Sequence, residues 1–267
     1  MLWLIGGTSE SAELVRRLGP GGAYVITVTT QRAKQLYPHC PQQVVVTRLT
    51  PATVGAFLQH YGIGKILDMS HPHAAQISQL AIQCAQDHHI PYLRYERPHT
   101  LTQHPQIHYW QNLAELCTSA LFRQWHAERI LVTLGYRQLP LLRDFWGSHT
   151  WFVRILPDAT ALETALAAGF RPQHIIALWP PVPLALERAL WQHWRITQVI
   201  AKASGRPGGE VVKQQLAQEL GVGLHLVQRP AIAYPQWTDD LQVALAFAQT
   251  ANIKNPCSFL PRVTPSS

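Results

Sequence analysis

Short apolar runs alternate with amphipathic stretches along most of the chain. Runs of about five residues rich in Val, Ile, Leu and Tyr are typical of buried strands, whereas apolar positions that recur every three or four residues indicate helices. The clearest helix is Ala74–His88, because Ile77, Leu80 and Cys84 fall on one face. Strand and helix patterns that follow each other in this way predict an α/β protein with mainly parallel strands.

The same criteria give an expected element order for each half of the chain. The strands expected in the first half are Leu2–Ile5, Tyr24–Thr29, Val44–Thr47, Lys65–Met69 and Tyr92–Tyr95. The helices expected between them are Glu10–Leu18, Ala52–Tyr61 and Ala74–His88. The strands expected in the second half are Arg129–Thr133, Trp151–Ile155, Ile175–Trp179, Thr197–Ala201 and Leu224–Gln228. Its expected helices are Leu113–Trp125, Ala159–Ala168, Leu184–His193, Glu210–Leu220 and a closing Asp239–Thr250.

One polar segment, Glu96–His108, interrupts this alternation with two prolines, which predicts a linker between domains. We therefore expect two Rossmann-like domains, residues 1–97 and 98–250, each with a mainly parallel sheet flanked by helices and with a ligand cleft between them. Residues 251–267 contain three prolines and show no apolar period beyond position 255, so we expect a disordered tail.

Composition indicates a globular protein with a sizeable core, since 47% of the residues are hydrophobic and 14% are charged. No apolar run approaches the roughly 18 residues that a membrane span requires. The start of the chain lacks a basic segment, and Glu10 and Glu13 come too early for a signal peptide, so we expect a cytoplasmic protein. Cys40, Cys84 and Cys117 lie far apart, as does Cys257, which predicts buried free thiols.

The net charge of +7, with 14 histidines not counted, favours an anionic partner. Nucleic acid, a phosphorylated cofactor and a polycarboxylate all meet that condition. The Lys and Arg residues are dispersed and form no block of the kind found in nucleic-acid-binding arms. We therefore expect a small anionic ligand and neither nucleic acid nor a membrane as partner.

The stretch LIGGTSES places Gly6 and Gly7 between an expected strand and an expected helix. Glycine lets the backbone approach a pyrophosphate closely, and the N-terminus of a helix binds anions. Thr8 and Ser9 add hydroxyl donors. The full Gly-x-Gly-x-x-Gly spacing is missing, however, and a tight turn with Thr8 or Ser9 as helix cap explains the same residues. Taken alone, the stretch leaves both interpretations open.

Arg32 and Lys34 follow the second expected strand, where a site for NAD usually carries an acidic residue. Cations at this place suit the 2′-phosphate of NADP. Two solvated basic side chains on a loop account for the pattern equally well.

The stretch DMSHPHAAQIS places Asp68, Ser70, His71 and His73 at the carboxyl end of the fourth expected strand, where open α/β sheets bind ligands. Pro72 fixes the turn and favours an extended Ser70-His71. Two histidines and a serine at such an edge favour a functional role. A zinc site fits poorly, because the turn is stiff and neither a cysteine nor a third ligand is near in sequence, so we expect no metal site.

Two stretches of the second half also follow expected strands. VTLGYRQLPLL contains Gly135 and Arg137, and IAKASGRPGGE contains Lys202, Ser204 and Gly205. Lysine, serine and glycine between a strand end and a helix are typical of an anion-binding edge. The Walker pattern and the Gly-x-Ser-x-Gly elbow are both missing from the sequence, which leaves an NTPase or an α/β-hydrolase unsupported.

With these stretches assembled, the chain from Met1 to about Ala248 resembles the precorrin-6A and cobalt-precorrin-6A reductase family of cobalamin biosynthesis. The resemblance rests on LIGGTSESAELVRRL and on DMSHPHAAQISQLAIQCAQDHHIPYLRYERP. The second block is similar to the family's D-A-T-H-P-F-A segment, its following helix and its strand ending in L-R-x-E-R-P. VTLGYRQL, FVRIL and AKASGRPGGE are further matches.

The resemblance implies an oxidoreductase that transfers hydride from NADPH, with NADH as the alternative, to one carbon–carbon double bond of precorrin-6A, giving precorrin-6B. Together with the patterns above, the expected cofactor-binding residues are Gly6, Gly7, Thr8, Ser9, Glu10, Arg32, Lys34 and Ser70. The residues expected to bind the anionic tetrapyrrole substrate are His71, His73, Arg137, Lys202, Ser204 and Gly205. His71 and Lys202 are the catalytic candidates, as proton donor or as holder of a carboxylate.

The chain also departs from the family's pattern. The departures are Ser70, His73, Ala201, the Arg206-Pro207 insertion and Trp179-Pro180-Pro181 in place of G-P-F. They leave open the alternative that the chain is a divergent, non-catalytic protein that binds a tetrapyrrole or a nucleotide. Another NADP-dependent reductase is a further alternative, which the repeated α/β pattern of the second half disfavours. We expect a monomer or a homodimer.

Overall fold

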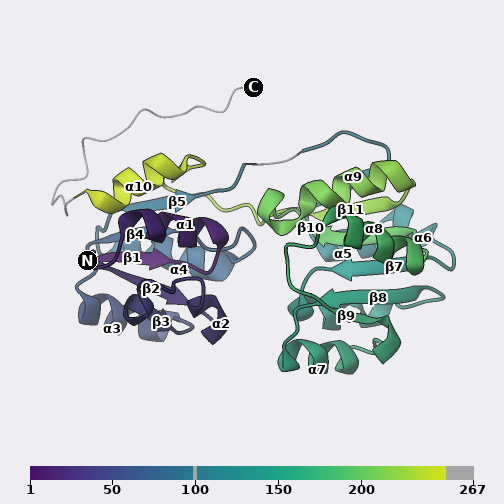
Figure 1. Cartoon of the computed structure of the whole chain (residues 1–267), viewed down its shortest axis with the longest axis horizontal. Coiled ribbons are helices and arrows are strands. Elements are labelled where there is room, and N and C mark those ends of the chain that lie inside the picture. Colours follow the sequence, from purple (N-terminus) through teal and green to yellow (C-terminus); the bar gives the residue numbers. More distant parts are fainter. Residues whose placement is uncertain (99–100, 251–267) are drawn as a thin grey trace. The chain divides into compact units, whose positions relative to one another are not determined.

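The computed structural model describes residues 1–98 and 101–250, and this part of the chain forms two compact units (Figure 1). The first unit contains residues 1–97 and 231–250, and the second contains Pro98–Pro230. Each unit has its own parallel sheet covered by helices on both faces, as the sequence predicts. None of the helices within residues 1–98 and 101–250 has the length and apolar character to span a membrane.

The sheet of the first unit has the strand order β12-β5-β4-β1-β2-β3, and all of its pairings are parallel. The strands are β1 (Leu2–Ile5), β2 (Tyr24–Val28), β3 (Val44–Val46), β4 (Lys65–Asp68), β5 (Tyr92–Tyr95) and β12 (Trp237–Thr238). The strand order reverses between β1 and β4. Open α/β sheets bind ligands at the carboxyl ends of the strands beside such a reversal.

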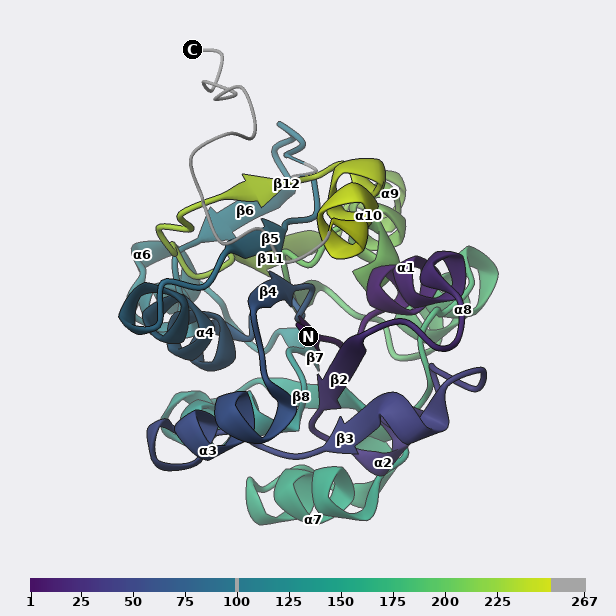
Figure 2. The same cartoon turned by 90° about the vertical axis from the view of Figure 1, so that its left-hand side faces the viewer.

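Five α-helices within residues 1–98 and 231–250 cover this sheet, and the side chains of β1 show how they divide between its faces. The helices are α1 (Ser9–Leu18), α2 (Gln31–Lys34), α3 (Pro51–Tyr61), α4 (Ala75–Asp87) and α10 (Leu241–Gln249), with a 3₁₀ turn at Pro41–Gln43. Leu4 packs with Leu14 and Ala244, on the face covered by α1 and α10 (Figure 2). Trp3 packs with Phe57 on the opposite face, under α3 and α4, because successive strand residues alternate in direction.

Residues 231–250 belong to the first unit, so their expected place in the second domain is wrong. β12 extends the first sheet by pairing with β5, and α10 packs beside α1. Buried Lys65 on β4 donates hydrogen bonds from Nζ to the carbonyls of Phe247 and Ala248 at distances of 3.0 and 2.8 Å. A cation at the C-terminal end of a helix is favourable, because the last carbonyls lack intrahelical partners. The expected tail, residues 251–267, lies outside the described residues.

The second sheet has the order β6-β11-β10-β7-β8-β9 and is parallel throughout. Its strands are β6 (Ile107–Trp110), β7 (Arg129–Thr133), β8 (Thr150–Ile155), β9 (Ile175–Ala177), β10 (Gln198–Lys202) and β11 (Gly223–Val227). Its helices are α5 (Leu113–Thr118), α6 (Ala120–Arg123), α7 (Ala159–Ala167), α8 (Leu184–His193) and α9 (Glu210–Leu220). Three 3₁₀ segments complete the unit, η2 (Tyr136–Phe145), η3 (Pro172–His174) and η4 (Arg206–Gly208). This strand order reverses between β7 and β10.

Two expectations about the second unit are corrected. The single helix expected over Leu113–Trp125 is divided at Ser119, which has extended dihedral angles and caps α6 by accepting from Phe122 N at 3.1 Å. The expected linker Glu96–His108 runs into β6, which pairs with β11.

Cys40, Cys84 and Cys117 are free and buried, as the sequence predicts, whereas Cys257 lies outside the described residues. Burial raises the pKa of the Cys117 thiol to about 12, which keeps it protonated and unreactive.

A buried histidine, His225, lies on β11 of the second sheet, next to the edge strand β6. Its ring stacks on that of His108 with a centroid separation of 5.0 Å. Its Nδ1 accepts a hydrogen bond from Trp110 Nε1 at 3.2 Å, so the proton of the neutral ring is on Nε2, which lies 2.9 Å from Gln198 Oε1. Burial, and secondly the neighbouring His108, lowers the pKa of His225 to about 3.

This low pKa predicts that the protein loses stability in mild acid. The ordinary pKa of histidine is 6.5, so between pH 6.5 and about 3 the unfolded chain binds a proton that folded His225 does not. The contribution of His225 to the free energy of unfolding is therefore complete above pH 6.5. Below that pH it falls by up to about 1.4 kcal/mol per pH unit. His225→Asn is expected to be less stable at pH 8 but to show a shallower decline, measured by urea unfolding from pH 8 to 4. Exposed His39→Asn is the control and keeps the wild-type slope; equal slopes for His225→Asn and the wild type would refute the prediction.

Candidate functional site

The glycine turn after β1 is held by hydrogen bonds within the protein. Gly6 N donates to Thr27 O at 2.9 Å, Gly7 N donates to Tyr37 Oη at 2.7 Å, and Thr8 N donates to Ser11 Oγ at 3.1 Å. These three N–H groups therefore already have acceptors. A ligand that approaches this turn meets instead the first turn of α1, where the leading N–H groups have no intrahelical acceptor.

Both glycines are required by the local geometry. A Cβ atom on Gly6 would overlap the hydroxyl of Tyr37, and Gly7 has a φ of +97°, which favours glycine. The helix begins after Thr8, whose side chain accepts from Ser11 N while Ser11 Oγ accepts from Thr8 N. The structure thus assigns the glycines a turn-forming role and gives Thr8 the role of helix cap.

Glu10 lies in the first turn of α1 and forms an ion pair with Arg97, in which Arg97 Nη2 is 2.9 Å from Glu10 Oε2. Ser9 Oγ donates to the same carboxylate at 2.9 Å. Burial alone would raise the pKa of Glu10, but the hydrogen bond and charge of Arg97 outweigh it and hold the pKa below its usual range. Glu10 is therefore an anion that joins the start of α1 to Arg97, two residues after β5.

Arg32 and Lys34 lie on α2, a short helix capped by Thr30, whose Oγ1 accepts from Ala33 N at 3.1 Å. The sequence predicts a loop here. The Arg32 side chain is exposed and that of Lys34 is half-buried. Tyr37 lies three residues after this helix, and its hydroxyl reaches the glycine turn, so α2 and the turn lie side by side.

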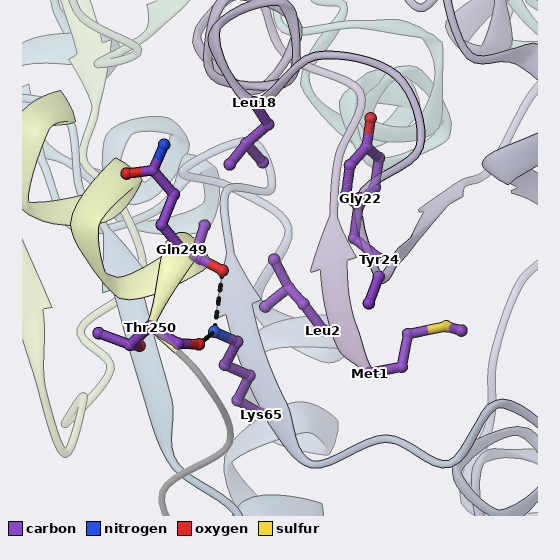
Figure 3. A pocket seen from close by; sticks show the side chains of 10 residues that line it. Met1, Leu2, Leu18, Gly22, Tyr24, Lys65, Gln249 and Thr250 are labelled. Carbon is purple, nitrogen blue, oxygen red and sulfur yellow. Dashed lines mark hydrogen bonds between the residues drawn. The ribbon is translucent and has the colours of Figure 1, made fainter.

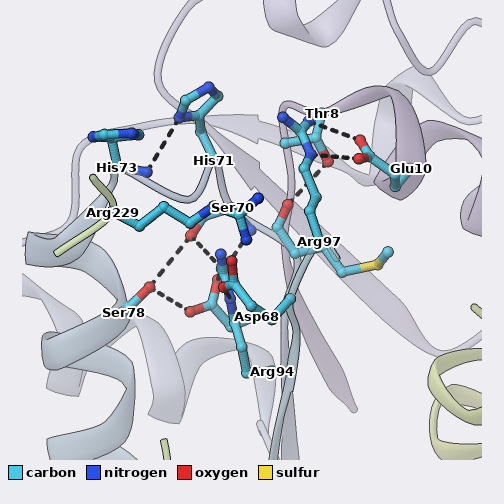
Figure 4. Close-up of polar contacts among 12 residues, drawn as sticks. Thr8, Glu10, Asp68, Ser70, His71, His73, Ser78, Arg94, Arg97 and Arg229 are labelled. Carbon is cyan, nitrogen blue, oxygen red and sulfur yellow. Dashed lines mark hydrogen bonds and ion pairs between the residues drawn. The ribbon is translucent and has the colours of Figure 1, made fainter. Parts of the chain in front are cut away.

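Asp68, at the end of β4, is completely buried and accepts four hydrogen bonds; Figure 4 shows it beside Ser70, Ser78 and Arg94. The donors are Ser70 N at 3.0 Å, Ser78 Oγ at 2.6 Å, Tyr92 Oη at 2.9 Å and Arg94 Nη1 at 2.9 Å. Buried charges are tolerated when they are paired and fully hydrogen-bonded. This carboxylate therefore connects β4, α4 and β5 beneath the turn that follows β4.

Arg94 is the cation of this network. Its Nη1 also donates to Ser70 Oγ at 2.9 Å, and its Nε donates to Glu96 Oε2 at 2.9 Å. Burial by itself would lower the pKa of Arg94, but Asp68 and Glu96 outweigh it and raise the pKa. Ser70, expected to bind a cofactor, is buried, and its hydroxyl accepts from Arg94.

His71 and His73 form the turn that follows Ser70, with ring centroids 5.8 Å apart. His71 Nδ1 accepts from His73 N at 3.2 Å, so the proton of the neutral His71 ring is on Nε2. Thr8 Oγ1 donates to Met69 O at 2.9 Å and joins this turn to the glycine turn. The structure thus brings the two sequence motifs together at the strand-order reversal of the first sheet.

The second unit places two cations beside its own strand-order reversal. Lys202 ends β10, and Arg137 lies on η2 after β7, the neighbouring strand. Burial, and secondly the charge of Arg137, lowers the pKa of Lys202. Within residues 1–98 and 101–250 neither side chain forms an ion pair with an acidic residue. The two cations therefore create a positive potential at this edge, and within residues 1–98 and 101–250 no carboxylate forms an ion pair with either of them.

Ser204 and Gly205 shape the turn after β10. Ser204 is buried, and a Cβ atom on Gly208 would overlap its Oγ. Gly205 N donates to Glu210 Oε2 at 2.6 Å, so this N–H also has a protein acceptor. Lys213 Nζ lies 3.3 Å from Gly209 O on the same turn, and burial lowers the pKa of Lys213 to about 8.

The sequence interpretation missed the residues that hold these turns in place. They are Tyr37, Arg94 and Arg97 in the first unit and Glu210 and Lys213 in the second. The segment LRYERP contains both arginines, and the sequence alone relates it only to the family resemblance. Its polar residues at a strand end were the available signal, whereas Tyr37 carries no signal in its neighbourhood.

Two further observations concern metal ligands and the position of a hollow in the first unit. Residues 1–98 and 101–250 contain no group of three or more His, Cys, Asp or Glu side chains arranged to hold a metal ion. A hollow of about 360 Å³ lies at the opposite, amino end of the first sheet, lined by Met1, Tyr24, Lys65 and the end of α10 (Figure 3). It contains none of the predicted site residues.

Comparison with known proteins identifies the family. The family model for precorrin-6x reductase CbiJ/CobK matches residues 1–249. The chain is 41% identical to the cobalt-precorrin-6A reductase of Synechocystis sp. over 250 residues, which are 93% of this chain and 95% of that protein. It is 30% identical to the cobalt-precorrin-6A reductase of Salmonella typhimurium over 251 residues, 92% of this chain and 93% of that protein.

A solved structure, the CobK precorrin-6A reductase, matches the fold with a TM-score of 0.71 at 20% identity, covering 92% of this chain and 94% of that one. The family model spans nearly all of the described chain, and the two curated relatives are aligned over almost their whole length. The chain therefore belongs to the precorrin-6x reductase CbiJ/CobK family, whose members are oxidoreductases of cobalamin synthesis.

Proposed function

We propose that the chain reduces one carbon–carbon double bond of precorrin-6A or cobalt-precorrin-6A, using NADPH. Family membership and the names of the curated relatives support the reaction class and the macrocycle. The single observation that carries the proposal is the pair of cations Arg137 and Lys202 at the strand-order reversal of the second sheet. Neither of them forms an ion pair with a carboxylate of the described residues. A polycarboxylate macrocycle supplies the negative charge that such a pair attracts.

The residues of the first unit fit a phosphorylated nucleotide cofactor. The start of α1 offers the N–H group of Ser9, which precedes the first intrahelical hydrogen bond, and α2 beside it carries Arg32 and Lys34. We assign the pyrophosphate to the first turn of α1 and the 2′-phosphate of NADPH to α2. NADPH supplies a hydride when bound, and the protein's part is to orient it and to exclude water. Gly6, Gly7 and Thr8 act by shaping the turn, and Glu10 acts through Arg97.

Reduction of the double bond adds a hydride to one carbon and a proton to the other. His71 and Lys202 are the candidate proton donors. His71 carries the proton of its neutral ring on Nε2, because Nδ1 already accepts from His73 N. Lys202 has a lowered pKa, which makes its ammonium group a stronger acid than an ordinary lysine. We also assign His73, whose ring lies beside that of His71, to the macrocycle. Ser204 and Gly205 hold the turn that presents Lys202.

The direct test is to mix the purified protein with precorrin-6A or cobalt-precorrin-6A and follow NADPH oxidation by absorbance. We expect one NADPH to be oxidised for each macrocycle reduced, with NADH used less efficiently. Arg32→Gln should narrow that preference, because it removes a cation assigned to the 2′-phosphate. A macrocycle that binds while neither cofactor is oxidised would support a non-catalytic binder, and absence of binding would refute the proposal.

Arg137→Gln tests the assigned carboxylate contact. Loss of one charge-assisted hydrogen bond is worth about 1.4 kcal/mol or more, so we expect KM for the macrocycle to rise about tenfold. Arg143→Gln is the matched control, an exposed arginine on the same segment η2, and should change KM less than about twofold. Equal effects of the two variants in steady-state kinetics would reject the role of Arg137.

A further inference from the structure

Tyr37 is a buried residue that joins two parts of the proposed cofactor site. It follows α2, and 2% of its surface is exposed. Its Oη accepts a hydrogen bond from Gly7 N at 2.7 Å and lies 2.7 Å from Ser11 Oγ. The Tyr37 hydroxyl therefore accepts the hydrogen bond of the Gly7 amide, which the glycine turn would otherwise offer to a ligand.

The hydrogen bonds around Tyr37 form one consistent set in which each hydroxyl donates once. Tyr37 Oη donates to Ser11 Oγ, Ser11 Oγ donates to Thr8 O at 2.7 Å, and Thr8 Oγ1 donates to Met69 O at 2.9 Å. The amides of Gly7 and Thr8 fill the acceptor positions on the first two hydroxyls. Every donor in the set is satisfied, so the arrangement favours a single geometry of the turn.

Steric contact enforces the same geometry. The Tyr37 hydroxyl occupies the space that a Cβ atom on Gly6 would need. On the other side, Tyr37 N donates to Lys34 O at 3.1 Å, so the residue continues directly from the helix that carries Arg32 and Lys34. Tyr37 thus contacts the glycine turn through its side chain and α2 through its backbone.

We infer that Tyr37 is a positioning residue that fixes the glycine turn and α2 relative to each other, and so sets the spacing between the pyrophosphate and the 2′-phosphate of the nicotinamide cofactor. This inference rests on the proposed function. Tyr37 touches neither phosphate in this account and acts through Gly7, Ser11 and α2. Cofactor affinity and the preference for NADPH over NADH depend on it, while the macrocycle and the chemical step do not.

Tyr37→Phe removes the hydroxyl and keeps the ring. We expect Kd and KM for NADPH to rise about tenfold and the NADPH-over-NADH ratio of kcat/KM to fall, with kcat and the KM for the macrocycle within about twofold of wild type. Kd is measured by titrating NADPH fluorescence without the macrocycle, and the kinetic constants by NADPH or NADH oxidation with it.

Tyr24→Phe is the matched control. Tyr24 is also a buried tyrosine of the first unit, and its hydroxyl donates to Gly19 O at 2.8 Å, at the C-terminal end of α1. A merely structural hydroxyl lowers Tm and leaves the cofactor constants unchanged, which is what we expect for Tyr24→Phe. If Tyr37→Phe matches Tyr24→Phe in NADPH affinity and in cofactor preference, the inference is overturned.

Ser11→Ala gives a second measurement should Tyr37→Phe not fold. It removes the other partner of the Tyr37 hydroxyl, and we expect about a threefold rise in KM for NADPH with kcat unchanged; a value equal to that of Tyr24→Phe overturns the inference. The wild-type protein separates this inference from the function itself. A wild type that neither binds nor oxidises a nicotinamide cofactor refutes the proposed function, whereas an active wild type with unaltered variants refutes only the role of Tyr37.

Discussion

The buried carboxylate of Asp68 is the interaction on which the site of the first unit depends. An ionised carboxylate without partners in the protein interior would cost several kcal/mol, and here four donors offset that cost. They come from the turn after β4, from α4 and from β5. The register that places Asp68 opposite Arg94 brings the charges together, so the pairing of two strands and the direction of the turn are set by one group. The position of His71 follows from that turn.

The two strand-order reversals use charge in opposite ways. In the first unit the polar groups are paired with one another, Asp68 with Arg94 and Glu10 with Arg97. In the second unit Arg137 and Lys202 form no ion pair with the described acidic residues. The paired charges make the edge of the first sheet rigid, and the hydrogen-bond donors left for a ligand are N–H groups at the start of α1. Cations without a carboxylate partner, as in the second unit, attract a carboxylated ligand. Both properties suit a reductase that holds a nucleotide and a polycarboxylate.

The sequence predicted the repeated strand and helix order closely, because buried parallel strands appear as short apolar runs and amphipathic helices show their period. Leu184–His193 and Glu210–Leu220 begin and end at the expected residues. The motifs were also found at the correct sheet edges. Their internal bonding could not be predicted, since Tyr37 contacts Gly7 from 30 residues away and a hydrophobic pattern contains no information on such a hydrogen bond.

The return of the chain to the first unit was missed for a related reason, because a strand of two residues, Trp237–Thr238, has no measurable period. Its effect on the site is nevertheless direct. Without β12, β5 would be the edge strand, and Arg94 N and Glu96 N would lack their acceptors, Gln236 O at 3.0 Å and Thr238 O at 2.8 Å.

The same returning segment covers the guanidinium group of Arg94 with the ring of Tyr234, at 5.2 Å. Excluding water from Arg94 strengthens its attraction to Asp68, because charges interact more strongly where the effective dielectric constant is low. The ion pair under the His71 turn is therefore completed by residues that follow the whole second unit in sequence. The carboxyl edge of the first sheet is therefore complete only when residues 231–250 pack against β5.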